Sequence, residues 1–447
     1  MLPAMAIDQP TPDESTVAVV GLGKIGLPLA AQYAGKGLTV IGCDVLPVVV
    51  DTINAGHSHI DEEPGLEEKI AAAVQSGRLR ATLDTTAAVK VAGTVVLIVP
   101  LLVDLKHEID FRQLDSATRA VGRGLRAGTL VICETTLPVG TTRTRIGPRL
   151  EEASGLRAGE DFHLAFSPER LYAGRIFEDL ARYPKIVGGV NERSTLRAVA
   201  FYRRVLDAEI QPVENAETAE FTKLAETTYR DVNIALANEL AVYGAHRQVN
   251  VRQAFNAANT QPYSHLHRPS IGVGGHCIPV YPHFLLADAV DGELELPRIS
   301  RATNDAMAGR ALDSLAAALG GLEARRVLVL GASYREDVKE IAFSTAIPLV
   351  EGLQRRGAVA LIHDPLFERR ELEALEAEIA DLEGDAPVDV DAVIVQALHS
   401  QYRRLDWKRF RGLKVVFDGR GSLDPATIRA TGATYLAVET ADNNYPK

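Results

Sequence analysis

Three cysteines in a chain of 447 residues are too few, and odd in number, to form a disulfide framework. Cys43 and Cys133 lie within apolar runs that are typical of buried strands, and we expect both to be core residues. Cys277 stands in a different context, described below. The sequence therefore excludes a fold that is held together by disulfide bonds.

The chain also lacks a Lys- or Arg-rich tract, and its formal net charge is −11. This balance argues against a nucleic-acid or membrane-surface partner. No apolar run reaches the length that spans a membrane. Residues 1–14 contain proline and acidic residues instead of a basic start and an apolar stretch, which predicts a disordered leader and not a signal peptide. We therefore expect a soluble, cytoplasmic protein.

Strands alternate with helices in the first part of the chain. Short β-branched or apolar runs predict the strands, and a helical pattern over Ile25–Lys36 follows the first of them. This alternation predicts a parallel, doubly wound sheet within a domain of residues 15–205. The predicted strands are Val17–Val20, Leu38–Asp44, Val95–Val99 and Leu130–Cys133.

One long helix is predicted over Ala216–Gly244, because its apolar residues follow helical spacing. About 28 residues of helix span roughly 42 Å. Such a helix can join two domains and pack against a second subunit. It falls within residues 206–315, which we expect to form a central helical domain. The helical spacing is carried by Phe221, Leu224, Ala225, Thr228, Val232, Ala235 and Leu236.

A second, smaller α/β domain is predicted over residues 316–447. Its first strand is followed by Gly331-Ala-Ser333, which lacks a three-glycine fingerprint, so we expect no second dinucleotide there. The predicted fold class is therefore α/β, with two Rossmann-like doubly wound domains joined by a long central helix. The strands predicted in this part are Arg326–Ala332, Val359–Asp364, Ala392–Gln396 and Val415–Asp418.

The turn Gly21-Leu-Gly-Lys-Ile-Gly26 carries a dinucleotide fingerprint between a predicted strand and a predicted helix. Asp44 lies 18 residues after Gly26, where a carboxylate can bind the ribose 2′-hydroxyl. No arginine stands beside it, which favours NAD over NADP. The alternative is a glycine turn that holds no ligand. The predicted cofactor-binding residues are Gly21, Gly23, Lys24, Ile25, Gly26, Asp44 and Thr136.

Cys277 ends the run Ile271-Gly-Val-Gly-Gly-His-Cys277. Gly274 and Gly275 lack a Cβ, so a ligand can approach the backbone closely there. A thiol nucleophile together with a nicotinamide site indicates oxidation through a covalent sulfur intermediate, which can convert an alcohol to an acid. The alternative is that Cys277 is a small buried hydrophobic residue.

Polar residues follow two of the predicted strands. Glu169 comes after the apolar run His163–Phe166, and Thr136 comes after the strand that ends at Cys133. Ligands bind at the carboxyl ends of strands in α/β folds, although both residues could be ordinary turn residues. Arg170 and Arg175 could bind a phosphate in bidentate fashion, and the alternative for both is surface charge.

Lys223 and Thr227 are four residues apart on the long helix and share a face with Arg230 and Asp231. The alternative is a solvated polar stripe. The histidines lack the spacing of metal ligands, so we predict no zinc site. The histidines considered are His265, His267 and His283.

Taken together, these motifs resemble the UDP-glucose/GDP-mannose dehydrogenase family, and more closely its members that oxidise UDP-N-acetylhexosamines at C6. The resemblance covers about residues 15–440. It implies an NAD domain, a long dimer-forming helix, a C-terminal nucleotide-sugar domain and a four-electron oxidation that uses two NAD. It also implies a homodimer that serves polysaccharide biosynthesis. The motifs are Gly21–Pro28, Thr135–Gly140, Ser167–Arg170, Lys223–Glu239, Gly272–Cys277 and Tyr334–Asp337.

By this resemblance Cys277 attacks the C6 aldehyde and later carries a thioester, and Glu169 activates the hydrolytic water. Thr136 helps to place that water, and Lys223 stabilises the developing oxyanion, as positive charge in a dry site does. Thr227 completes the catalytic set by position. The residues predicted to bind substrate are Glu169, Arg170, Arg175, Lys223, Gly274, Gly275, Tyr334 and Arg335.

The chain departs from the family at three positions. Thr227 replaces a common Asn, Tyr281 a common Asp, and Ala342 a common Arg. A tyrosine would need a strongly lowered pKa to act as a base near neutral pH, so we expect Lys223 to act through water instead. Three alternatives stay open: a UDP-glucose 6-dehydrogenase, a two-electron nucleotide-sugar dehydrogenase, and a catalytically silent nucleotide-sugar-binding protein.

Overall fold

The computed structural model describes residues 13–104, 108–290, 292–384 and 386–440. The chain divides into two compact units, residues 1–226 and 227–447. The helix α9 (Ala216–Ala245) crosses this division. Within the described part of the chain, no helix combines the length and the apolar character that a membrane span requires.

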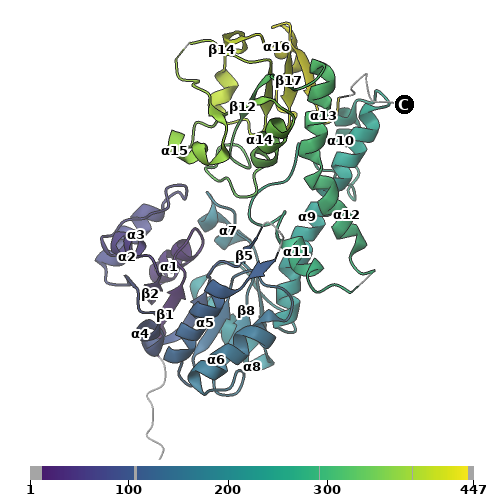
Figure 1. Cartoon of the computed structure of the whole chain (residues 1–447). Coiled ribbons are helices and arrows are strands. Elements are labelled where there is room, and N and C mark those ends of the chain that lie inside the picture. Colours follow the sequence, from purple (N-terminus) through teal and green to yellow (C-terminus); the bar gives the residue numbers. More distant parts are fainter. Residues whose placement is uncertain (1–12, 105–107, 291, 385, 441–447) are drawn as a thin grey trace, which may run out of the picture. The chain divides into compact units, whose positions relative to one another are not determined.

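The first unit, coloured purple to teal in Figure 1, is built on an eight-stranded sheet in the order β10-β9-β8-β7-β4-β1-β2-β3. Neighbouring strands are parallel except for β8 and β9. From β3 to β8 this is the strand order 3-2-1-4-5-6 of a dinucleotide-binding Rossmann fold. The strands are β1 (Asp13–Val20), β2 (Thr39–Cys43), β3 (Leu79–Thr82), β4 (Ala92–Leu97), β7 (Leu130–Cys133), β8 (His163–Phe166), β9 (Lys185–Gly189) and β10 (Ile210–Pro212).

Both faces of this sheet are buried, because alternate residues of each strand enter different cores. Val17 and Val19 of β1 belong to one hydrophobic cluster, and Ala18 and Val20 belong to another. Helices α1, α2, α3, α7 and α8 pack on the first face, and α4, α5 and α6 on the second. The helices are α1 (Gly26–Gly35), α2 (Pro47–Asn54), α3 (Leu66–Gln75), α4 (Thr85–Val91), α5 (Arg112–Gly124), α6 (Gly147–Ser154), α7 (Ile176–Arg182) and α8 (Glu192–Val205).

The second unit contains a six-stranded parallel sheet in the order β13-β12-β11-β15-β17-β18. This is again the order 3-2-1-4-5-6, so the unit repeats the Rossmann topology. The strands are β11 (Arg326–Leu330), β12 (Val359–His363), β13 (Glu378–Ile379), β15 (Ala392–Val395), β17 (Val415–Asp418) and β18 (Thr434–Ala437). The helices are α10 (Val251–Ala258), α11 (Tyr281–Leu286), α12 (Glu295–Asp305), α13 (Met307–Leu319), α14 (Ala346–Arg355), α15 (Arg369–Leu372) and α16 (Pro425–Arg429).

The predicted fold class is confirmed: both sheets have Rossmann topology, and α9 ends one residue beyond the predicted helix. Cys43 and Cys133 are buried, as expected. β1 begins at Asp13, because the Asp13 backbone already pairs with Ala92 of β4. Residues 13 and 14 of the predicted leader therefore belong to a strand, and residues 1–12 lie outside the described part of the chain.

Candidate active site

The glycine turn after β1 has the geometry of a dinucleotide cradle. Gly21 has φ +98°, and a Cβ there would lie 2.7 Å from the Ile98 carbonyl oxygen. A Cβ on Gly26 would lie 1.9 Å from the Gly21 carbonyl oxygen. A Cβ on Gly23 would meet nothing within 4 Å. Gly21 and Gly26 are therefore required by the turn itself, whereas Gly23 keeps its outer side accessible to a pyrophosphate.

Asp44 stands at the carboxyl end of β2, beside this turn. Its two carboxylate oxygens accept hydrogen bonds from the backbone N–H groups of Leu22 and Leu46, both at 3.0 Å. A carboxylate has about four acceptor positions, so Asp44 can still accept ribose hydroxyls. Within the turn, Ile25 packs against the core and Lys24 pairs with Glu62 at 3.4 Å. These residues fit a bound dinucleotide.

The predicted hydroxyl of Thr136 lies in the loop that follows β7, which we call the threonine loop. Thr136 is buried three residues after β7, and the neighbouring Thr135 hydroxyl donates to the Val99 carbonyl at 2.7 Å. The Glu220 carboxylate on α9 accepts the backbone N–H groups of Gly140 and Thr142, at 2.5 and 2.8 Å. Burial raises the pKa of Glu220 to about 7. These bonds tie the threonine loop to α9.

Glu169 belongs to a buried charge cluster that the sequence analysis missed. The Lys185 ammonium lies 2.7 Å from Glu169 Oε2 and 2.9 Å from Glu134 Oε2. The hydroxyls of Tyr33 and Tyr202 donate to Glu134 Oε1, at 3.3 and 2.6 Å. We call Glu134, Glu169 and Lys185 the carboxylate–lysine cluster. Its sequence signal was weak, because a Lys at the start of a strand and a Glu at the end of one are usually solvated.

The two carboxylates of the cluster differ in pKa. Burial raises the pKa of Glu134 to about 7, although Lys185 opposes the shift. Burial also acts to raise the pKa of Glu169, but Lys185 and the hydrogen bonds to Glu169 outweigh it and bring this pKa below its ordinary value. Glu169 is therefore the ionised member at neutral pH, and Glu134 is the member that more readily holds a proton.

The two arginines considered for phosphate binding are engaged in ion pairs. Arg170 Nε lies 2.8 Å from Glu226 Oε2 on α9. Arg175 Nε lies 3.2 Å from Asp179 Oδ1, and its Nη2 donates to the Tyr183 hydroxyl at 2.7 Å. Arg170 is partly exposed and Arg175 is exposed, and a role of either in substrate binding stays a prediction.

The polar face of α9 is buried and not solvated. Lys223, Thr227 and Asp231, each four residues apart, are all buried, whereas Arg230 is half-buried. The interpretation of this face as a solvated stripe is therefore wrong, because neighbouring elements cover it. Arg301 Nη1 of α12 donates to Asp231 Oδ1 at 2.6 Å.

The cysteine loop packs against the loop between β11 and α14, and both belong to the second unit. A Cβ on Gly274 would lie 2.7 Å from Tyr334 Cβ, and one on Gly275 would lie 3.0 Å from the Tyr334 ring. The Gly275 N–H donates to the Ala342 carbonyl at 2.9 Å. His276 Nε2 lies 3.2 Å from Glu340 Oε2. The two glycines are therefore needed for close packing of these loops.

Cys277 itself is partly exposed, unlike the other two cysteines. Its carbonyl accepts the Tyr281 backbone N–H at 2.9 Å, which places Tyr281 at the start of α11 with its ring against Phe284. In the facing loop, Arg335 Nε donates to the Tyr334 hydroxyl at 2.9 Å. Cys277 is therefore not the small, fully buried hydrophobic residue of the alternative interpretation.

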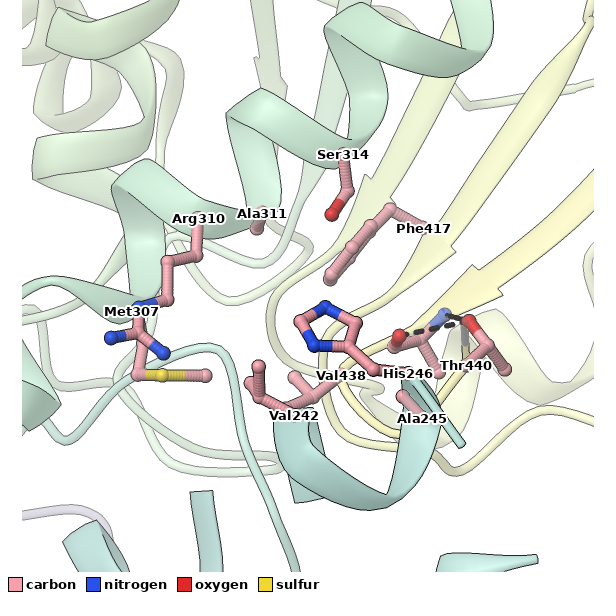
Figure 2. Close-up of a pocket in the computed structure, with 11 residues that line it drawn as sticks. Val242, Ala245, His246, Met307, Arg310, Ala311, Ser314, Phe417, Val438 and Thr440 are labelled. Atoms are coloured by element: carbon pink, nitrogen blue, oxygen red, sulfur yellow. Dashed lines mark hydrogen bonds between the residues drawn. The ribbon is translucent and has the colours of Figure 1, made fainter. Parts of the chain in front are cut away.

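A small cavity of about 40 Å³ lies elsewhere in the second unit (Figure 2). His246 and Arg310 line it together with the Phe417 ring. It is too small for a nucleotide sugar and contains none of the predicted site residues. The described residues also hold no group of three or more His, Cys, Asp or Glu that is suited to a metal ion.

Comparison with known proteins matches three family models along the chain. They are the NAD-binding domain (residues 15–206), the central domain (217–306) and the UDP-binding domain (328–425) of the UDP-glucose/GDP-mannose dehydrogenase family. The UDP-N-acetyl-D-mannosamine dehydrogenase of Pyrococcus horikoshii is 36% identical over 413 residues, which is 90% of this chain and 95% of that protein.

Two further similarities extend over nearly the whole chain. The NDP-N-acetyl-D-galactosaminuronic acid dehydrogenase of Ralstonia nicotianae is 33% identical over 94% of this chain and 98% of its own length. The solved structure of a UDP-D-ManNAc dehydrogenase from Pyrococcus horikoshii aligns with a TM-score of 0.85 and 34% identity, covering 96% of this chain and all of that one.

Proposed function

The chain belongs to the UDP-glucose/GDP-mannose dehydrogenase family, and from this premise we propose that it oxidises the C6 alcohol of a UDP-N-acetylhexosamine to the uronate. It is an NAD-dependent UDP-sugar dehydrogenase, an oxidoreductase that acts on a CH–OH group. One observation carries the choice of sugar: the curated relatives described above are named for N-acetylated sugars.

NAD bound at the Gly21–Gly26 turn supplies the hydride acceptor for both oxidations. We assign the covalent step to Cys277, whose thiolate adds to the C6 aldehyde to form a thiohemiacetal. Oxidation of that adduct leaves a thioester on Cys277 Sγ. Water then attacks the thioester carbonyl, its proton passes to the Glu169 carboxylate, and the C–S bond breaks to release the acid and the thiolate.

Exposure supports Cys277 as the nucleophile among the three cysteines. Burial raises the pKa of Cys43 to about 12 and that of Cys133 further still, so neither can form a thiolate near neutral pH. Cys277 alone keeps part of its surface accessible. The space beside Gly274 and Gly275 is filled by Tyr334, so these glycines hold the cysteine loop against its neighbour, and the expected approach of a ligand to the backbone there is not met.

We assign oxyanion stabilisation to Lys223 and water placement to Thr136, both of which are buried. A positive charge in a water-poor site favours a developing alkoxide. Tyr281→Phe should therefore slow the first hydride transfer by about tenfold or less, as loss of one neutral hydrogen bond does. Lys223→Ala should slow it more, and a larger loss in the tyrosine variant would refute this assignment.

A homodimer formed through α9 completes the proposal. Large apolar side chains are exposed on this helix, and their spacing of three, four, seven or eight residues places them on one side of it. We assign NAD binding to residues 15–205, dimerisation to 206–315 and the nucleotide sugar to 316–447. The exposed residues are Phe221, Tyr229, Leu236, Leu240 and Tyr243.

The test is a panel of UDP- and GDP-sugars scored by NADH released per sugar. UDP-N-acetyl-D-mannosamine should give two NADH and one uronate, and Cys277→Ser should form no acid while binding NAD normally. Preference for UDP-glucose would select the first alternative. One NADH per sugar would indicate a two-electron enzyme, and sugar binding without NADH would indicate a silent binding protein.

A further inference from the structure

We propose that Lys185 is a positioning residue for thioester hydrolysis: it holds Glu169 ionised and correctly placed, and Glu134 anchors Lys185 from the other side. The inference rests on the proposed function, because it assumes that Glu169 is the base. It adds two residues, Lys185 and Glu134, that lie outside every motif considered in the sequence.

The sheet topology explains why these residues meet. β9 is antiparallel to β8, with Phe166 opposite Gly188. The first residue of β9 therefore lies at the carboxyl end of β8, where the Glu169 loop begins. Glu134 directly follows β7, which is the neighbour of β8 on its other side. If β9 were parallel to β8, Lys185 would lie at the amino end of β8, on the far side of the sheet from Glu169.

The contacts leave Lys185 little freedom. Its side chain is 6% exposed, that of Glu134 is 0% exposed and that of Glu169 is 11% exposed. The ammonium bonds to one oxygen of each carboxylate and lies 5.1 Å from the centre of the Tyr202 ring. Glu169 Oε1 accepts the Arg170 backbone N–H at 2.7 Å. Glu169 is thus fixed through both oxygens, and its side chain is the most exposed of the three.

The charges around Glu169 indicate that Lys185 also controls the ionisation of this carboxylate. The groups that face Glu169 are Lys185 from β9 and Glu134 after β7, with Tyr33 of α1 and Tyr202 of α8 behind Glu134. Lys185 is the cation of this set. Without it, no cation would offset the burial of Glu169, so the pKa of its carboxyl would rise and Glu169 would be ionised only at a higher pH.

A purely structural ion pair predicts something different. Loss of a buried partner would lower the folded, active fraction of the enzyme, but it would leave the pH dependence of the remaining activity unchanged. A positioning role moves the acid limb of the hydrolysis rate, because that limb reports the ionisation of the base. The pH profile of this one step therefore separates the two roles.

The experiment measures single-turnover acid release from the full-length enzyme with NAD and UDP-N-acetyl-D-mannosamine at pH values from 5 to 9. In Lys185→Met the acid limb of thioester hydrolysis should move upward by about one pH unit or more, as expected for loss of a cation within hydrogen-bond distance. The first NADH should appear at nearly the wild-type rate. Lys185→Arg keeps the charge and should hold the limb near its wild-type position.

Glu134→Gln is the matched control. It removes the like charge and keeps the shape, so the acid limb should stay in place or move downward. This variant and Lys185→Arg also decide the question if Lys185→Met does not fold. An acid limb that does not move in Lys185→Met, or one that moves upward in both control variants, would overturn the proposal.

The Glu169→Gln variant shows whether a negative result concerns only the role of Lys185 or the proposed mechanism as a whole. If Glu169→Gln hydrolyses the thioester normally, Glu169 is not the base and the proposed mechanism fails, whatever Lys185 does. If Glu169→Gln accumulates the thioester but Lys185→Met keeps the wild-type profile, only the role of Lys185 fails.

Discussion

The two sheets share one strand order, yet their first strand–helix turns differ. In the first unit α1 begins at Gly26, the last residue of the glycine turn, and Asp44 is only partly buried. In the second unit β11 is followed by a loop that runs to the start of α14 at Ala346. Asp364 follows β12 as Asp44 follows β2, but it is 2% exposed.

The bonds of the two aspartates explain the contrast. Asp364 Oδ2 accepts the N–H groups of Ala332 and Ser333 at 2.8 and 2.9 Å, and it lies 2.9 Å from His399 Nε2. His399 is completely buried. The position that would bind a ribose in the first unit is therefore filled by a histidine in the second. The same topology can carry a cofactor site or a closed structural network, and the difference lies in a few side chains.

Replacing each aspartate by alanine should give the largest difference between the two units, in stability for one and in NAD binding for the other. Asp364→Ala leaves four buried donors, on Ala332, Ser333 and His399, without an acceptor and should lower the free energy of unfolding by about 2–4 kcal/mol. Asp44→Ala should change stability far less but weaken NAD binding by about tenfold or more, because the ribose loses a charged acceptor. Chemical denaturation and NAD titration of both variants measure these effects.

Equal losses of stability in both variants would contradict this assignment, as would a loss of NAD affinity in a folded Asp364→Ala enzyme. Asp364→Asn is the conservative control, because its amide oxygen can still accept the two backbone N–H groups. It should recover part of the stability that Asp364→Ala loses.

Substitution of Gly23 tests whether this glycine serves NAD binding and not the stability of the turn. Gly23→Ala meets no atom of the protein, so it should leave the melting temperature nearly unchanged. The added methyl would occupy the side from which the pyrophosphate approaches, and NAD affinity should fall by about tenfold or more. Gly35→Ala, at another position with no neighbour within 4 Å, is the matched control and should leave NAD affinity unchanged. Isothermal titration with NAD checks both.

Particular residues show what the sequence could predict. The bounds of β7, β8 and β17 follow from short apolar runs, and α9 follows from apolar spacing over many turns. The predicted strand that ends in Asp364 is also present, but nothing in its pattern showed that the carboxylate is buried. That burial depends on His399, which is 35 residues away in sequence.

The carboxylate–lysine cluster escaped prediction for a similar reason. Glu134, Glu169 and Lys185 meet only because β9 reverses direction relative to β8. Strand direction is set by tertiary packing and leaves no local signal at Lys185. Burial of charge is therefore the part of the site that single-residue patterns predict least well.

Mild acid should change the stability of the two units in opposite directions. We expect this effect to be smaller than those of the aspartate and Gly23 substitutions. Burial lowers the pKa of His363 to about 4, so the unfolded state binds more protons below pH 6.5 and the second unit loses stability as the pH falls from there to about 4. Burial raises the pKa of Glu220 to about 7, so the folded first unit binds the extra proton and gains stability as the pH falls from about 7 to 4.5.

Hydrogen exchange at pH 7.5 and 5.5, corrected for the intrinsic exchange rate, measures the two responses separately. His363→Gln should weaken the response of the second unit. Glu220→Gln should reduce but not abolish that of the first, because burial also raises the pKa of Glu134 to about 7. Parallel destabilisation of both units in acid, or responses that neither variant alters, would refute the assignment.

The covalent role of Cys277 is tested most directly by the intact mass of the Glu169→Gln enzyme after mixing with NAD and UDP-N-acetyl-D-mannosamine. The amide cannot take a proton from water, and loss of a general base typically slows a step by about 10²–10⁴-fold. The account predicts a burst of two NADH per site and a sugar acyl adduct on the Cys277 peptide that is absent from Glu169→Gln/Cys277→Ser. Steady turnover without an adduct, or an adduct on another residue, would contradict it.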